Sequence, residues 1–287
     1  MRGFLRRVRT ALKGASQALP ETVLTLNQRK CWHENGFLIL KDLIPRELVA
    51  AINVEIESTV RNRRAFPNLK IDILSGALAG KRMPIAEAPE EVFSGSFELS
   101  NIYLDSAVVV RAALSDPLVA ILSALLDGDP IVVNSLNLTR GSQQPSHCDT
   151  WSMPPKVPNK LAASFMCLED LHPDAGPLFF YPGSHTVPPY QFSQGATLAI
   201  EIEMSSRRAY IESEVAARGL LKTAFVGTAG DVFLSHPQLL HGGLPIRNWA
   251  LTRKSLVTRY WRRQDVPFRT VGRVDGRKYF SRWRYPA

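Results

Sequence analysis

Residues 131–139, IVVNSLNLT, combine an apolar start with alternating apolar and polar positions, which is typical of a buried β-strand. Similar short segments recur, separated by Gly, Pro and Asp and mostly without helices between them: residues 147–151, 161–168, 177–181, 231–235 and 255–261. Antiparallel strands need only turns between them, whereas parallel strands need a longer crossover. The pattern therefore predicts a mainly β protein with flanking helices and a double-stranded β-helix core, the jelly-roll or cupin-like architecture.

Helical segments precede this core. Thr25 is a candidate N-cap for a helix that ends before Gly36, and residues 37–40 are apolar enough for a buried strand. Pro45 suits the first turn of a second helix, and Asp116 is expected to cap a third. We expect a basic leader at 1–20 followed by a single domain at 21–287. The domain should comprise a helical part at 21–128, a jelly-roll core at about 129–262 and a basic extension at 263–287.

The chain of 287 residues has an ordinary globular composition, with 45% hydrophobic and 21% charged residues. No apolar run is long enough to span a bilayer. The three cysteines lack the regular spacing of a disulfide scaffold, so we expect a reducing, cytoplasmic location. The composition does not indicate an oligomeric state.

The formal net charge is +9, and basic residues gather at both ends of the chain. A solvated basic tail is the leading interpretation of the N-terminal segment. Its apolar positions also fit a helical stripe, which keeps peripheral membrane contact open as an alternative. We expect no nucleic-acid partner, because no nucleic-acid-binding motif accompanies the charge.

The stretch SHCDTW at 146–151 places His147 and Asp149 two positions apart. On a strand these two side chains would point to one face. Two histidines and one carboxylate form the facial triad that holds Fe(II) and leaves coordination positions open. Alone, the pair is a weak signal, and a hydrogen-bonded pair at a strand end is the alternative.

A third ligand should come from a distant strand. Residues 230–243, GDVFLSHPQLLHGG, turn into a strand and place His241 near its far end, and His236 is the alternative ligand. Arg253 follows inside an apolar strand, where an arginine is costly unless a carboxylate meets it. A dicarboxylic cosubstrate would be such a partner.

Three stretches together resemble the phytanoyl-CoA dioxygenase family of Fe(II)/2-oxoglutarate oxygenases. They are LNQRKCWHENGFLILKDLIPRELV at 26–49, HCD with CLEDLHPDAGPLFFYPGSH at 167–185, and GTAGDVFLSHPQLLHGG at 227–243. The resemblance implies that the metal ligands are His147, Asp149 and His241. It also implies that Arg253, with Ser255, binds the distal carboxylate of 2-oxoglutarate.

The same resemblance suggests further contacts. Phe165 occupies the place of an aromatic residue that lines the cosubstrate pocket, and Asn137 lies on a strand that often supplies a polar contact. Thr150 and Trp151 follow the metal pair and are candidates for the cosubstrate and substrate pockets, with a core role equally open for Trp151. The loop after His241 departs from the family pattern, so Arg247 is a candidate to face the substrate.

The implied activity uses Fe(II), 2-oxoglutarate and O₂ to hydroxylate an unactivated C–H bond of a small or medium-sized organic substrate, releasing succinate and CO₂. Desaturation, cyclisation or epimerisation by the same enzyme class, and a non-catalytic jelly-roll binding module, are the alternatives. The basic balance hints at an anionic substrate. Five cations lie in the two segments that interrupt the strand pattern, 65–98 and 186–226: Lys70, Lys81, Arg82, Arg207 and Arg208. They would suit an anionic substrate, but a solvated face is the leading interpretation for each.

Overall fold

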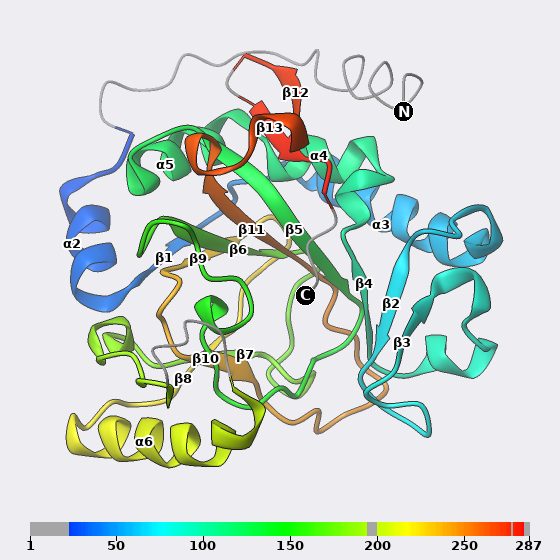
Figure 1. The fold of residues 1–287 in the computed structure, drawn as a ribbon. Coiled ribbons are helices and arrows are strands. Elements are labelled where there is room, and N and C mark those ends of the chain that lie inside the picture. Colours follow the sequence, from blue (N-terminus) through cyan, green and yellow to red (C-terminus); the bar gives the residue numbers. More distant parts are fainter. Residues whose placement is uncertain (1–22, 194–199, 277, 284–287) are drawn as a thin grey trace.

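The computed structural model describes residues 23–193, 200–276 and 278–283 (Figure 1). The predicted leader at 1–20 lies outside these residues. The helices are α2 (Leu26–Asn35), α3 (Arg46–Arg61), α4 (Ala107–Ala113), α5 (Asp116–Leu126) and α6 (Met204–Ala217). The strands are β1 (Phe37–Leu40), β2 (Lys70–Ile73), β3 (Arg82–Pro84), β4 (Phe97–Ser100), β5 (Pro130–Leu138), β6 (Leu161–Cys167), β7 (Leu178–Phe180), β8 (Thr223–Phe225), β9 (Val232–Ser235), β10 (His241–Gly243), β11 (Ser255–Arg262), β12 (Val271–Asp275) and β13 (Lys278–Ser281).

Two sheets form the core, as the strand pattern predicted. The large sheet has the order β1-β9-β6-β11-β5-β4-β2-β3, with β13 pairing with β5 and with β12. The small sheet has the order β10-β7-β8. All strand pairs are antiparallel except that of β13 with β5. The mainly β jelly-roll prediction is confirmed.

An aromatic cluster joins the two sheets. The ring of Phe233 on β9 lies 4.8 Å from the ring of Phe180 on β7 and 5.3 Å from that of Phe225 on β8. The other face of the large sheet packs against α3, α4 and α5, where Leu256 and Tyr260 of β11 join the helix residues in one apolar cluster. Apolar burial on both faces therefore fixes which side of each strand faces the space between the sheets.

The N-terminal elements form largely as predicted. Thr25 caps α2 in a reciprocal capping box with Gln28, and Gly36 ends the helix with φ of 77°. The N-cap of α5 is Ser115 rather than Asp116, which is the first helical residue, with Pro117 in the first turn. No single helix in the described ranges is long and apolar enough to cross a membrane; α4 and α5 pass that test only together, bent by 52°.

Three predictions need correction. Residues 147–151 do not form a strand: His147 makes a single bridge, and the backbone then turns into a 3-10 helix, η5 (Asp149–Trp151). Residues 65–98 are not simply an insertion, because they supply β2, β3 and the start of β4 to the large sheet. The C-terminal extension likewise supplies β12 and β13, so the sheet extends beyond the predicted range of 129–262 on both sides.

Candidate active site

Two histidines from remote segments meet between the sheets. The backbone N–H of His147 donates to the carbonyl of His241 at 2.9 Å, and the N–H of His241 donates to the carbonyl of His147 at 3.0 Å. Their ring centroids are 4.5 Å apart. His241 begins β10, which pairs with β7, so the small sheet fixes the position of this histidine. The backbone bridge thus holds the two imidazoles together.

Hydrogen bonds fix the tautomer of both rings. The Nδ1 atom of His147 lies 2.9 Å from the carbonyl of Pro145, and the Nδ1 atom of His241 lies 2.9 Å from the carbonyl of Leu239. A carbonyl oxygen can only accept, so each Nδ1 carries a proton, and Nε2 is the ring atom that can offer a lone pair to a metal ion. Burial, followed by the nearby His241, lowers the pKa of His147 to about 4, which keeps its ring neutral at pH 7. Both Nε2 atoms are therefore suited to bind a metal ion.

The Asp149 carboxylate is buried and held by one strong interaction. Its Oδ1 atom accepts a hydrogen bond from Nε of Arg259 at 2.6 Å, while its Oδ2 atom is buried without a hydrogen-bond partner. Burial alone would raise the pKa of Asp149, but the Arg259 guanidinium and the two histidines lower it below its usual value. The carboxylate is therefore ionised, with one oxygen left for a cation.

A second hydrogen bond orients Arg259. Its Nη1 atom donates to Oδ1 of Asn134 at 2.7 Å, and the Asn134 amide donates in turn to Oδ1 of Asn101 at 2.9 Å. This buried chain leaves the Asp149 carboxylate little rotational freedom. Within the described ranges, no three His, Cys, Asp or Glu side chains are already spaced as a metal-binding cluster. The fit of Fe(II) here consequently rests on the chemistry of the donor atoms: two free imidazole nitrogens and one orphaned carboxylate oxygen.

Arg253 is a buried cation that forms no ion pair with a carboxylate of the described residues. Its side chain is 2% exposed, its Nε atom has no hydrogen-bond partner, and its guanidinium lies 5.1 Å from the centre of the Phe165 ring. Burial lowers the pKa of Arg253 to about 10. The Ser255 hydroxyl is also buried and unpartnered. These orphaned donors fit the distal carboxylate of 2-oxoglutarate, because buried charges are normally paired.

The alternation of β11 explains which residues share the site. Ser255, Val257 and Arg259 lie on one face of the strand, whereas Leu256 lies on the face covered by helices. Asn137 pairs directly with Leu256 and therefore shares the helix-covered face, where its amide donates to the backbone carbonyl of Ser255 at 3.2 Å. The prediction that Asn137 contacts the cosubstrate beside Arg253 is wrong for this reason.

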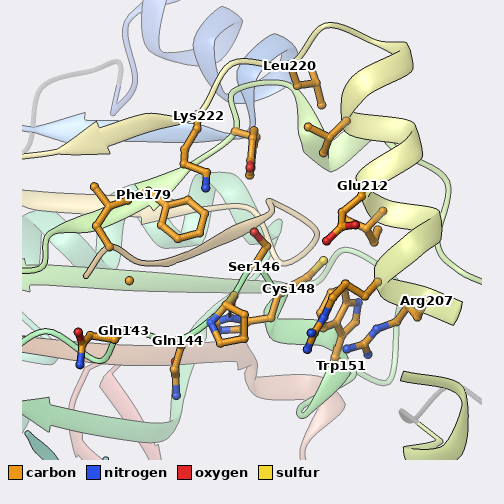
Figure 2. A pocket seen from close by; sticks show the side chains of 18 of the residues that line it. Gln143, Gln144, Ser146, Cys148, Trp151, Phe179, Arg207, Glu212, Leu220 and Lys222 are labelled. Carbon is orange, nitrogen blue, oxygen red and sulfur yellow. Dashed lines mark hydrogen bonds between the residues drawn. The ribbon is translucent and has the colours of Figure 1, made fainter. Parts of the chain in front are cut away.

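A cavity of about 1020 Å³ opens beside His147 (Figure 2). Helix α6 and the segment after it line the cavity together with Phe179 of β7 and Leu136 of β5. Lys222 of that segment lies 4.5 Å from the centre of the Phe179 ring. Trp151 lines the cavity, as the sequence suggested for a substrate-facing residue. The volume suits a small or medium-sized organic molecule.

Residues 32–255 match the model of the family described as Phytanoyl-CoA dioxygenase (PhyH). The chain belongs to this family. The peroxisomal phytanoyl-CoA dioxygenase of Mus musculus is 25% identical over 230 residues, which cover 78% of this chain and 64% of the mouse protein. The Rattus norvegicus protein of the same name is 22% identical over 231 residues, again 78% of this chain and 64% of that protein. The matched part thus spans less than two thirds of these curated relatives.

Solved structures share the fold of this PhyH-family protein. EctD from S. alaskensis, solved with 2-oxoglutarate and 5-hydroxyectoine, has a TM-score of 0.63 and 19% identity over 87% of this chain and 80% of EctD. The carbocyclase SnoK of nogalamycin biosynthesis has a TM-score of 0.63 and 14% identity over 87% of each chain. The epimerase SnoN, solved with Fe³⁺, alpha ketoglutarate and nogalamycin RO, has a TM-score of 0.59 and 14% identity over 91% of this chain and 85% of SnoN.

Three predicted positions lie elsewhere in the PhyH-family chain. The Thr150 hydroxyl donates to Gln238 at 3.0 Å rather than reaching Arg253 or Ser255. The side chain of Arg247 is 80% exposed, lies 3.8 Å from Asp174 and does not line the cavity, so its predicted substrate contact is wrong. The alternative ligand His236 instead faces the rings of Trp32 and His185.

Sequence reasoning missed two cavity residues, Arg259 and Glu98, and favoured the wrong interpretation of a third, Arg207. Arg259 was hidden inside an apolar strand, although the same argument that singled out Arg253 applies to it. Glu98 on β4 is buried, and burial followed by the nearby Asp72 raises its pKa to about 7. Arg207 was expected on a solvated face but is only 4% exposed.

Proposed function

We propose that this chain is an Fe(II)/2-oxoglutarate-dependent dioxygenase that hydroxylates an unactivated C–H bond of a small or medium-sized organic substrate. The observation that carries the proposal is the pairing of two imidazoles, each with its Nδ1 atom on a backbone carbonyl, beside an ionised carboxylate with one unpartnered oxygen. Membership of the PhyH family supports it. The overall balance is substrate R–H, O₂ and 2-oxoglutarate giving R–OH, succinate and CO₂.

The residues of this chain divide the task. His147, Asp149 and His241 would hold Fe(II), which supplies the activation of O₂ when bound. Arg259 fixes the rotamer of Asp149 and neutralises part of its charge. Apolar side chains in part of the cavity wall, among them Phe179 and Ile211, would help to keep water from the oxidised carbon. The protein therefore contributes orientation and shielding, and the cofactor carries the oxidation.

Arg253 would anchor the cosubstrate. A guanidinium meets a carboxylate through two parallel N–H donors. Arg253 lies two residues before β11 and not inside the strand as predicted, and the unpartnered Ser255 hydroxyl at the start of β11 would add a third donor. Phe165 packs under the guanidinium at 5.1 Å and limits its movement. This arrangement would fix one end of a keto diacid.

A second outcome of the same chemistry is favoured by the fold comparisons. SnoK is a carbocyclase and SnoN an epimerase, and both share this fold. Cyclisation, desaturation or epimerisation therefore stands beside hydroxylation as an alternative for this chain. The mass of the product separates these outcomes, because hydroxylation adds one oxygen, desaturation removes two hydrogens and epimerisation leaves the mass unchanged.

The test is a screen of candidate substrates with Fe(II), 2-oxoglutarate and O₂, reading succinate and product mass. We expect substrate-dependent succinate, lost in His147→Ala and Asp149→Ala but kept in His172→Ala, whose side chain is 53% exposed. In Arg253→Ala we expect the 2-oxoglutarate concentration for half-maximal rate to rise about 10- to 100-fold. Full activity in Asp149→Ala would refute the proposal, and absence of succinate with every substrate would favour a binding module.

We further propose a reducing location such as the cytoplasm. Cys31, Cys148 and Cys167 are all free thiols, which supports this proposal. The curated relatives are named as peroxisomal, so imaging of a tagged full chain decides between the two compartments. Peripheral membrane contact through the basic N-terminus stays a prediction. The expectation of no nucleic-acid partner also stays a prediction.

A further inference from the structure

Three arginines are buried in the described part of the chain: Arg207, Arg253 and Arg259. Arg259 meets Asp149 at 2.6 Å, and under the proposed function Arg253 meets 2-oxoglutarate. Arg207 remains without a carboxylate: its Nε and Nη1 atoms are buried and make no hydrogen bond. A buried cation is costly unless it is paired, so a permanently unpaired Arg207 would be unusual.

The surroundings of Arg207 fix its plane but satisfy none of its donors. Its guanidinium carbon lies 3.4 Å from the centre of the Trp151 ring and 5.8 Å from that of Phe192. Burial lowers the pKa of Arg207, Cys148 opposes this, and Arg208 lowers the pKa further, with no carboxylate acting on it. The stacked guanidinium therefore keeps its N–H donors along its edge, where an oxyanion binds in two-point fashion.

The position of the stacked guanidinium indicates that its ligand is the substrate and not the cosubstrate. Arg207 lies in the first turns of α6, and both Arg207 and Trp151 line the cavity beside His147 (Figure 2). The cavity wall is mixed: Phe179, Ile211 and Leu244 are apolar, whereas charged side chains also line it, namely Glu98, Arg208, Glu212, Lys222 and Arg259. Of these cations, Arg259 is paired with Asp149, and Arg208 and Lys222 are exposed. Arg207 is therefore the cation of the described lining that is buried without a carboxylate partner.

We propose that Arg207, stacked on Trp151, binds an oxyanion of the substrate, a carboxylate or a phosphate, while the apolar part of the substrate fills the cavity toward His147. This inference rests on the proposed function for its link to catalysis, and it names the substrate class: an amphipathic organic anion. Trp151 acts as the positioning residue that holds the guanidinium plane.

The binding test uses three probes with the same alkyl chain: octanoate, octyl phosphate and octan-1-ol. Each is titrated calorimetrically into the full chain without metal or 2-oxoglutarate. Because charge-assisted hydrogen bonds are strong, we expect at least one anionic probe to bind about tenfold more tightly than octan-1-ol. The tighter of the two anions identifies the head group, and either result supports the proposal.

Variants assign this preference to one residue. Arg207→Gln should reduce it to about twofold or less, because no charged donor then faces the oxyanion. Arg29→Gln removes the same charge from an exposed position on α2 and should keep the preference, as should Arg253→Gln. Equal binding of all three probes by the wild type, an unchanged preference in Arg207→Gln, or its loss only in Arg253→Gln would each overturn the proposal.

A stability measurement separates ligand binding from a structural role. Arg207→Met keeps an apolar side chain on Trp151 and removes the unpaired buried charge, so we expect an equal or higher melting temperature without ligand. The rise in melting temperature that the anionic probe gives the wild type should disappear. A melting temperature several degrees below wild type would contradict the proposal, because it would make Arg207 a structural cation.

Failure of this inference and failure of the proposed function are distinguishable. Arg207-dependent probe binding without any succinate in the substrate screen would contradict the dioxygenase assignment and leave the anion site standing. Succinate release driven by a substrate without an oxyanion, at the same rate in wild type and Arg207→Gln, would contradict the anion site alone.

Discussion

At the scale of single residues, the site depends on how each polar atom is satisfied. The Nδ1 atoms of His147 and His241 each lie 2.9 Å from a backbone carbonyl two residues earlier in the chain. These contacts orient both rings, with Nε2 left for a metal ion, and no second side chain is needed to do so. Asp149 depends instead on Arg259, which in turn is held by Asn134. The histidines are thus oriented by local backbone, while the carboxylate is oriented by a distant strand.

Arg259 should therefore control the carboxylate. In Arg259→Gln, Asp149 loses its charged partner, and breaking a buried ion pair costs about 3–5 kcal/mol in the free energy of unfolding. Loss of such an orienting contact weakens metal affinity about 10- to 100-fold. Urea denaturation and Fe(II) titration under anaerobic conditions measure both effects. Arg111→Gln, at an exposed position of α4, is the control, and an Fe(II) affinity equal to wild type in Arg259→Gln would exclude the positioning role.

Glu98 should make the stability of the protein depend on pH. Burial raises its pKa to about 7 from an ordinary value of 4.5, so between these pH values the unfolded chain releases a proton that the folded protein keeps. Stability therefore falls as pH rises through this window, by up to about 3 kcal/mol.

Glu98→Gln removes this titration. We expect the loss of unfolding free energy between pH 4.5 and pH 8 to be smaller by up to about 3 kcal/mol in the variant than in the wild type. Chemical denaturation at several pH values gives both curves, and any pH-independent effect of the glutamine cancels in the comparison. Parallel curves for the two proteins would show that Glu98 is not buried as a carboxylic acid.

At the scale of elements, apolar pattern and turn residues predicted most strands, because burial between two sheets imposes that pattern directly. The predicted strand at 147–151 was wrong because a single backbone bridge holds His147, and no ladder of strand hydrogen bonds follows. The periodicity of the sequence does not distinguish a single bridge from a ladder. The prediction for Asn137 was wrong because the pairing of β5 with β11 sets the face on which its side chain lies: Asn137 pairs with Leu256. Register of this kind is a tertiary property.

The C-terminal hairpin shows the same limit. Its charge suggested an extension, yet β13 pairs with β5, Phe280 joins the main apolar cluster, and the hydroxyl of Tyr103 donates to the carbonyl of Ser281 at 2.9 Å. We expect a chain ending at residue 262 to melt at least several degrees below the full chain. A chain ending at residue 283 is the control and should melt like the full chain. Equal melting of both truncated chains would mean that the hairpin contributes no stability.

At the scale of the whole molecule, the fold buries three arginines among the described residues, and Arg207 and Arg259 line the cavity. The sequence singled out the histidines, Asp149 and Arg253 as candidates because each lies in a segment with a recognisable pattern. It did not predict Arg207, because a charged residue in an interrupting segment is usually solvated, and only the packing of α6 over Trp151 buries it. Arg259 also lies beyond the part of the chain matched by the PhyH family model, which ends at residue 255.

The central claim is that His147, Asp149 and His241 bind one ferrous ion beside Arg253. The most direct measurement is a crystal structure of the full chain grown anaerobically with Fe(II) and 2-oxoglutarate, with anomalous scattering recorded at the iron edge. We predict one iron peak in contact with both Nε2 atoms and the Asp149 carboxylate, and the distal carboxylate of 2-oxoglutarate on Arg253. An iron peak at other residues, or a well-ordered structure in which His241 points away from His147 and the ion, would contradict the account.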